Sequence, residues 1–133
     1  MADLPKSKFL VIGLGSGRSG TASLTSLLDR QRGGVCFHEL NPSCAVFAGN
    51  SQFAVNTLCE FREILQGGSR ANLSIDYSRP SSVTTYNSLQ AMDEINLIGD
   101  IAYYYLNYVD DLIALEPAVR FVCIKRERQR TVA

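Results

Sequence analysis

The sequence predicts one α/β domain built on a parallel β-sheet. Short apolar runs alternate along the chain with longer segments of helical spacing, which is the order of elements in βαβ proteins. The first run, Phe9–Ile12, is continuously apolar and rich in residues that favour strands, as is typical of a central strand buried on both faces. The chain has 133 residues, of which 46% are hydrophobic. This size and composition suit a single domain over residues 1–133 with its own core.

A helix is predicted after the first strand, because apolar residues within 24–28 lie at positions i, i+3 and i+4, and Gly33–Gly34 ends the pattern. Residues 35–37 form a short apolar run, which predicts the second strand. Apolar residues then recur with a helical period over 50–65, and Gly67–Gly68 follows them. This pattern predicts a second helix.

The segment 68–88 is polar and contains Pro80 together with several Ser and Thr residues, so it predicts an irregular connection with a brief strand at 73–75. The same criteria predict the later elements: a third strand at 95–98, a helix over 105–113 stopped by Pro117, a fourth strand at 119–124, and a helix start at 129–133. The last residues, 131–133, carry no capping glycine, proline or polar tail. We therefore expect the chain to be the first part of a longer protein, with an incomplete sheet.

Charge is balanced overall but segregated along the chain. Thirteen Lys and Arg residues against thirteen Asp and Glu residues give a net charge of zero, which argues against a nucleic-acid or membrane-surface partner. Residues 1–38 carry five bases and two acids, residues 39–116 three bases and ten acids, and residues 117–133 five bases and one acid. Positive charge therefore collects at the two ends of the chain.

The four cysteines and the N-terminus indicate a soluble cytoplasmic protein. Residues 1–8 lack the apolar region of a signal peptide, and no run approaches the roughly 20 apolar residues of a spanning helix. The cysteines form no CxxC pair and have no metal-type spacing with His38. We expect free thiols with packing roles and no metal site. The cysteines are Cys36, Cys44, Cys59 and Cys123.

A glycine-rich segment directly after the first strand and before a helix is the most informative motif. Glycines allow close backbone approach, consecutive amides form a cradle, and a helix N-terminus adds a positive dipole. Arg18 adds a charged donor, and Ser19 and Thr21 add hydroxyl groups. We expect this loop to bind a phosphate or sulfate group. Its residues are Gly15, Ser16, Gly17, Arg18, Ser19, Gly20 and Thr21.

Two other phosphate-binding motifs are weaker matches. A nucleoside-triphosphatase loop requires G-x-x-x-x-G-K-[ST], and Thr21 stands where its lysine must be. No strand offers a recognisable magnesium-holding carboxylate. The dinucleotide fingerprint G-x-G-x-x-G is present at Gly15, Gly17 and Gly20, and Glu39 lies where a ribose-binding acid would fall. An NAD(P)-binding Rossmann domain therefore stays an alternative.

Residues 15–24, GSGRSGTASL, resemble the 5′-phosphosulfate loop of the P-loop sulfotransferase family. A second match is residues 120–128, RFVCIKRER, which resemble the family's 3′-phosphate segment, an apolar strand ending in an arginine, here Arg126. Arg128 stands where the family has proline, and the family's serine eight residues after that arginine would fall beyond Ala133. The resemblance is strong over 9–42 and moderate over 100–133.

The resemblance implies a three-layer fold of the P-loop NTPase type, in which the first and fourth strands are neighbours. It implies that the protein transfers a sulfuryl group from 3′-phosphoadenosine-5′-phosphosulfate to a hydroxyl or amine of a small-molecule, glycan or peptide acceptor. The glycine-rich loop and Arg126 would bind this donor, and Arg18 would stabilise the departing oxygen without a metal. Glu39 is the first candidate for the acceptor base and His38 the second.

Several roles stay open at the level of sequence. His38 can instead be a polar residue that orients the loop, and Glu39 can pair with Arg18 when no ligand is bound. The tyrosines at 103–105 and Tyr108 have the spacing of core residues, although adenine stacking is an alternative. A truncated or non-catalytic nucleotide-binding module is the alternative to an enzyme.

Overall fold

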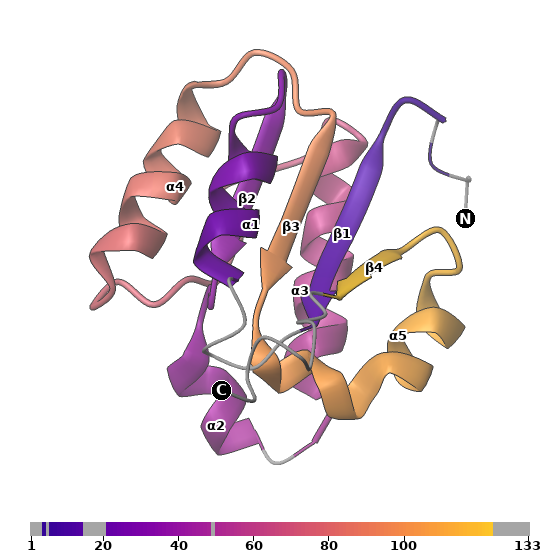
Figure 1. The fold of residues 1–133 in the computed structure, drawn as a ribbon. Helices are drawn as coiled ribbons and strands as arrows, with labels where there is room; N and C mark the ends of the chain where they lie inside the picture. Colours follow the sequence, from indigo (N-terminus) through magenta and orange to yellow (C-terminus); the bar gives the residue numbers. More distant parts are fainter. Residues whose placement is uncertain (1–3, 5, 15–20, 49, 124–133) are drawn as a thin grey trace, which may run out of the picture.

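The computed structural model describes Leu4 and residues 6–14, 21–48 and 50–123 (Figure 1). These residues form a four-stranded sheet in the order β2-β3-β1-β4, and each of its strand pairs is parallel. The strands are β1 (Phe9–Leu14), β2 (Gly34–His38), β3 (Leu97–Ile101) and β4 (Arg120–Cys123). The expected α/β class with a parallel sheet is confirmed, and the first and fourth strands are neighbours as the resemblance implied.

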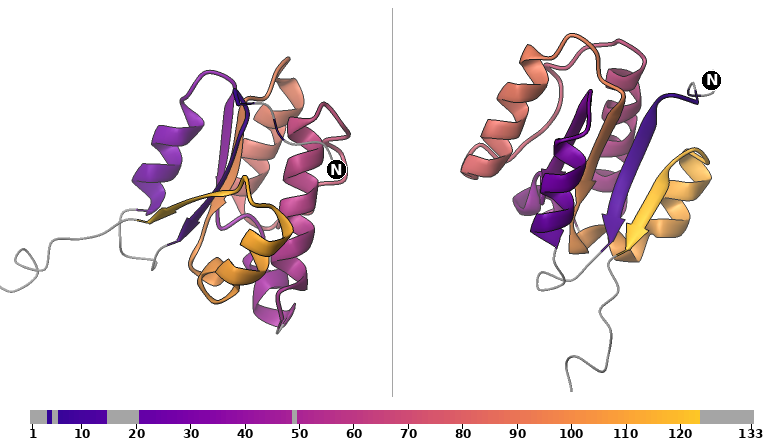
Figure 2. Two further views of the ribbon diagram at one scale, coloured as in Figure 1. Left: turned by 90° about the vertical axis from the view of Figure 1, so that its right-hand side faces the viewer. Right: turned by 45° about the horizontal axis from the view of Figure 1, so that its top comes forward.

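Helices cover both faces of this sheet. Figure 2 shows α1 on one face and α3 with α5 on the other, while α4 packs against the edge strand β2. The helices are α1 (Thr21–Asp29), α2 (Pro42–Ala48), α3 (Gln52–Leu65), α4 (Pro80–Ala91), the 3₁₀ helix η1 (Tyr103–Tyr108) and α5 (Val109–Leu115). No helix within these described ranges is long and apolar enough to cross a membrane.

The main core lies between the sheet and α3. Alternate residues of the strands point to this side, and Leu10, Val35 and Ile98 are fully buried there. They meet the apolar stripe of α3, in which Leu58 and Phe61 are also buried. The helical period predicted over 50–65 is thus confirmed as the core-facing stripe of α3.

Gly67 and Gly68 end α3 as expected. Gly67 has φ +86°, a left-handed conformation that glycine adopts without steric cost. The Gly68 N–H then donates to the Glu63 carbonyl at 2.8 Å, which satisfies a carbonyl left open at the helix end. The stop signal read from the sequence therefore acts through a defined C-terminal cap.

The irregular connection predicted for residues 68–88 is confirmed over 68–79 and wrong beyond them. Part of this segment is helix α4, and Leu73 and Ile75 are buried residues of a loop rather than a strand. Only Ser82 and Leu89 of α4 are fully buried, so the helix has no strong apolar stripe for periodicity to detect. Helix α2 was not predicted either. The third strand lies at 97–101 rather than 95–98, because a charged residue inside it interrupts the apolar run.

Candidate functional site

The four parallel strands end at one edge of the sheet, where ligands bind in open α/β folds. Leu14, the last residue of β1, is the register partner of Cys123, the last residue of β4. The glycine-rich motif begins directly after Leu14, and Arg126 follows Cys123 by three positions in the sequence. The two predicted anion-binding segments therefore leave the sheet from adjacent strand ends.

Most predicted donor-binding residues lie outside the described part of the chain. These are Gly15, Ser16, Gly17, Arg18, Ser19, Gly20 and Arg126. Thr21 is the first residue of α1, so a helix N-terminus does follow the motif. The helix start predicted at 129–133 also lies outside the described residues.

His38 and Glu39, the two candidates for the acceptor base, stand at the same edge. His38 is the last residue of β2, and Glu39 follows it with φ +54°, a left-handed conformation that is uncommon for residues other than glycine. Glu39 Oε2 lies 3.3 Å from Arg79 Nη2, and Arg79 Nη2 also donates to the His38 carbonyl at 3.4 Å. Arg79 is thus a partner of Glu39 among the described residues, and the alternative pairing with Arg18 lies outside them.

Arg79 is a functional candidate that the sequence interpretation missed. It directly precedes the first residue of α4, in the segment predicted to be irregular, and it is separated from Glu39 by 40 positions. The side chain of Arg79 is 30% exposed and that of Glu39 is 22% exposed, so the pair is open to an incoming ligand. Arg79 Nε is buried and has no hydrogen-bond partner among the described residues.

The backbone after β2 is held by acceptors from β3 and η1. The N–H of Glu39 donates to the Ile101 carbonyl at 3.1 Å. The N–H of Leu40 donates to Asp100 Oδ1 at 3.0 Å, and the N–H of Asn41 donates to the Tyr104 hydroxyl at 3.3 Å. Beyond the end of β2, the acceptors are therefore first a backbone carbonyl of β3 and then side-chain oxygens of β3 and η1.

Asp100 is the centre of this arrangement. Its side chain is fully buried, and Oδ2 accepts the hydroxyls of Tyr105 at 2.6 Å and Tyr104 at 3.0 Å. The pKa of Asp100 is raised to about 6, mainly by burial and to a smaller extent by the nearby Glu39 charge, against the hydrogen bonds from Tyr105, Leu40 and Tyr104, which lower it. Since both carboxylate oxygens face protein donors in a site closed to solvent, this acid is unsuited to hold magnesium.

The tyrosines divide into core and surface residues. Tyr104 and Tyr105 are buried, as expected for core side chains, whereas Tyr103 is 47% exposed. Asp100 raises the pKa of both buried tyrosines in addition to the larger effect of burial. Asp100 was not predicted from the sequence, and the signal for it was an acid inside the otherwise apolar run 97–102.

All four cysteines are free thiols, as expected. The expected packing role holds for Cys36, which is buried, and burial raises the pKa of its thiol. It is wrong for Cys44, Cys59 and Cys123, which are exposed. Within the described ranges, no cluster of three or more His, Cys, Asp or Glu side chains could hold a metal ion.

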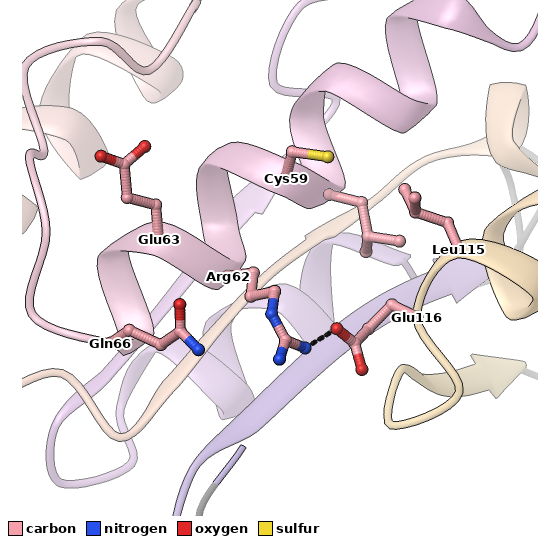
Figure 3. Close-up of a pocket in the computed structure, with 7 residues that line it drawn as sticks. Cys59, Arg62, Glu63, Gln66, Leu115 and Glu116 are labelled. Carbon is pink, nitrogen blue, oxygen red and sulfur yellow. Dashed lines mark ion pairs between the residues drawn. The ribbon is translucent and has the colours of Figure 1, made fainter. Parts of the chain in front are cut away.

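A separate cavity of about 200 Å³ lies between α3 and α5 (Figure 3). An ion pair between Arg62 and Glu116 forms part of its wall, and Leu58, Cys59, Glu63, Gln66 and Leu115 complete the lining. None of the candidate site residues lines it. The cavity lies on the face of the sheet that α3 and α5 cover, and it is distinct from the strand-end edge.

The strand order bears on the dinucleotide alternative. In a dinucleotide-binding domain the second strand lies beside the first, whereas here β3 separates β2 from β1. Glu39 is therefore displaced by one strand from the place of a ribose-binding acid. The chain matches no family model, and it matches no curated protein and no solved structure.

Proposed function

We propose that this chain is the donor-binding part of a sulfotransferase with a P-loop type fold, which uses 3′-phosphoadenosine-5′-phosphosulfate. The observation that carries the proposal is the parallel pairing of β1 with β4, in which Leu14 and Cys123 are register partners. The motif that resembles a 5′-phosphosulfate loop and the one that resembles a 3′-phosphate segment follow these two residues. Two anion-binding segments on adjacent strands suit one doubly phosphorylated nucleotide.

In the proposed reaction an acceptor hydroxyl or amine attacks the sulfur of the donor. The bond from sulfur to the bridging phosphate oxygen breaks, and 3′,5′-bisphosphoadenosine leaves with the electron pair. The loop amides, Ser19, Thr21 and above all Arg18 would stabilise the charge that develops on that oxygen. Arg126 would bind the 3′-phosphate. This chemistry consists of positioning and charge stabilisation and requires no metal.

Glu39 is the residue that would accept the proton of the acceptor. Its carboxylate stands at the strand-end edge, held by Arg79, and β3 separates its strand from β1. Two strand spacings amount to roughly 10 Å, which leaves room for an acceptor hydroxyl between the carboxylate and the phosphosulfate. His38, whose carbonyl accepts from Arg79, would then orient the segment rather than act as the base.

The test of donor binding is calorimetry on the full chain with 3′,5′-bisphosphoadenosine, adenosine 5′-diphosphate and NAD. We expect the bisphosphate to bind most tightly, because neither of the other two ligands carries a 3′-phosphate for Arg126 to bind. Arg18→Ala should weaken this binding by about 1.5 to 3 kcal/mol, or more than tenfold, the usual value for a hydrogen bond to a charged group. Arg30→Ala, which removes an exposed arginine just after α1, is the control and should leave the affinity unchanged.

Three results would contradict the proposal. Tightest binding of NAD would favour a dinucleotide-binding domain. Equal affinity for the bisphosphate and the diphosphate would contradict a 3′-phosphate site at Arg126. Tight bisphosphate binding without transfer to any acceptor would instead indicate the non-catalytic nucleotide-binding module.

A further inference from the structure

We propose that Asp100, with Tyr104 and Tyr105, is a positioning residue that fixes the backbone of residues 39–41 and thereby holds the Glu39 carboxylate at the strand-end edge. The inference rests on the proposed function for the role of Glu39. The coupling between Asp100 and the 39–41 segment is a property of the protein alone and is testable separately.

The first support is the hydrogen bonding of the segment. Each of the three successive N–H groups from Glu39 to Asn41 donates to an acceptor of β3 or η1. Two of these acceptors are side-chain oxygens, Asp100 Oδ1 and the Tyr104 hydroxyl, and the second of them also donates to Asp100 Oδ2. Removal of the Asp100 carboxylate would therefore release the Leu40 N–H directly and loosen the Asn41 N–H through Tyr104.

The second support is the conformation that these bonds maintain. Glu39 has φ +54°, a left-handed conformation that is unfavourable for an L-residue with a Cβ. Such a conformation persists where the surroundings determine it, often at functional sites. The carbonyl of Leu40 is held as well, by the Asp76 N–H at 3.1 Å and the Ser82 hydroxyl at 3.2 Å. The bonds at Glu39, Leu40 and Asn41 therefore fix the backbone from which the Glu39 side chain reaches Arg79.

The third support is the loss of fold stability that the ionised Asp100 carboxylate causes. A fully buried acid whose folded pKa is raised lowers the stability of the fold when it ionises, because the unfolded chain ionises the same group more easily. An apolar residue of similar size would avoid this cost. An ionised acid with three donors around it is thus better explained by the geometry it imposes than by the stability it provides.

Protonation of Asp100 should weaken its hold on the segment. The titratable groups near it are Tyr104 and Tyr105 from η1, Cys36 from β2, and Glu39 with its partner Arg79. A neutral carboxyl must donate one hydrogen bond, and its partners are two hydroxyls at Oδ2 and one amide at Oδ1. A protonated Oδ2 can donate to a hydroxyl that reverses its role, while Oδ1 still accepts from the Leu40 N–H as a neutral carbonyl oxygen. Because a hydrogen bond to a charged group is stronger than one to a neutral group, the positioning should be strongest above the Asp100 pKa of about 6 and weaken as the pH falls through it.

The experiment is amide hydrogen exchange of the ¹⁵N-labelled full chain, corrected for intrinsic exchange, with Leu40 as the reporter. In the natural sequence, protection of Leu40 relative to Phe37 inside β2 should fall about tenfold between pH 7 and pH 5, the equivalent of one hydrogen bond. In Asp100→Asn the relative protection should be low at both pH values. The backbone chemical shifts of Glu39 should move away from their left-handed values in the same variant and, by a smaller amount, at pH 5.

Two further variants keep the proposal testable if Asp100→Asn fails to fold. Tyr104→Phe retains the Asp100 charge but removes the hydroxyl that accepts from Asn41, so it should lower the protection of Asn41 without a net change in charge. Tyr103→Phe alters a half-exposed tyrosine of the same helix and should change neither amide.

Equal relative protection of Leu40 at pH 7 in Asp100→Asn and the natural sequence would overturn the positioning role. An equal loss of amide protection at Leu40 and Phe37 in Asp100→Asn would also overturn it, because Asp100 would then only stabilise the fold. Failure of the chain to bind 3′,5′-bisphosphoadenosine would remove the proposed function while the exchange result stood, so the two failures are distinguishable.

Discussion

At the scale of single residues, Glu39 is the side chain with the most specific expected role. If it accepts the proton of the acceptor, Glu39→Gln should lower kcat on the order of 10²- to 10⁴-fold and leave the Kd of 3′,5′-bisphosphoadenosine nearly unchanged, because size and hydrogen bonding are retained while basicity is lost. His38→Asn should cost less. The measurement is transfer of radiolabelled sulfate from the donor to a panel of hydroxyl and amine compounds. The opposite ranking would assign the base to His38, and a large loss of nucleotide affinity in Glu39→Gln would contradict the role.

The sequence could predict Glu39 and His38 but not the residues that hold them. Both candidates follow a recognisable strand, and the ends of parallel strands meet at one edge, so their place could be inferred locally. Arg79 contacts Glu39 across 40 positions of the chain, and Asp100 contacts Leu40 across 60. Neither contact leaves a periodic signal in one sequence. The glycine-rich loop and Arg126 stay predictions, since they lie outside the described residues.

At the scale of elements, the buried ion pair between Arg62 and Glu116 joins α3 to the turn before β4. The two side chains are 10% and 7% exposed, and Glu116 Oε1 also accepts the Ala118 N–H at 3.2 Å. Glu116→Gln should lower the free energy of unfolding by about 3 to 5 kcal/mol, because the buried Arg62 guanidinium loses the charge of Glu116. Urea unfolding followed by circular dichroism is the measurement.

The control for this pair is Glu63→Gln, an exposed glutamate of α3 that lines the same cavity. It should change the unfolding free energy by less than about 0.5 kcal/mol. Joint replacement by Arg62→Met and Glu116→Leu should regain most of the lost stability, because no unpaired charge is left buried. Glu116→Gln as stable as the natural sequence would show that the pair contributes nothing to the joining of α3 and β4.

Elements with a strong apolar pattern were predictable, and the others were not. The stripe of α3 and the continuous run of β1 are each buried in the core, so burial and pattern agree. Helix α4 contributes Leu89 to the core but is otherwise polar along most of its length, and its N-terminus is marked by Pro80 alone. In β3, the buried Asp100 interrupts the apolar run, and the same residue accepts the hydrogen bond from the Leu40 N–H.

At the scale of the whole molecule, the strand order explains the segregation of charge. The basic ends of the chain contain β1 and β4, which pair in parallel. The acidic middle, residues 39–116, carries three bases and ten acids and contributes β3 and most of the helices. In a chain with a net charge of zero, the strands that belong to the two basic ends are therefore neighbours in the sheet, and the proposed anionic ligand depends on this arrangement.

This arrangement predicts that salt weakens the binding of 3′,5′-bisphosphoadenosine. Raising NaCl from about 0.05 M to about 0.5 M should increase the Kd on the order of tenfold, because screening shortens the reach of partly exposed charges. Arg126→Gln should weaken the binding and reduce its dependence on salt. Lys6→Gln removes one charge from the exposed segment that leads into the opposite end of β1, so it controls for net charge and should leave both quantities unchanged. Equal effects of the two variants, measured by calorimetry across the salt series, would show that only the overall charge matters and that β1 and β4 do not form a local anion site.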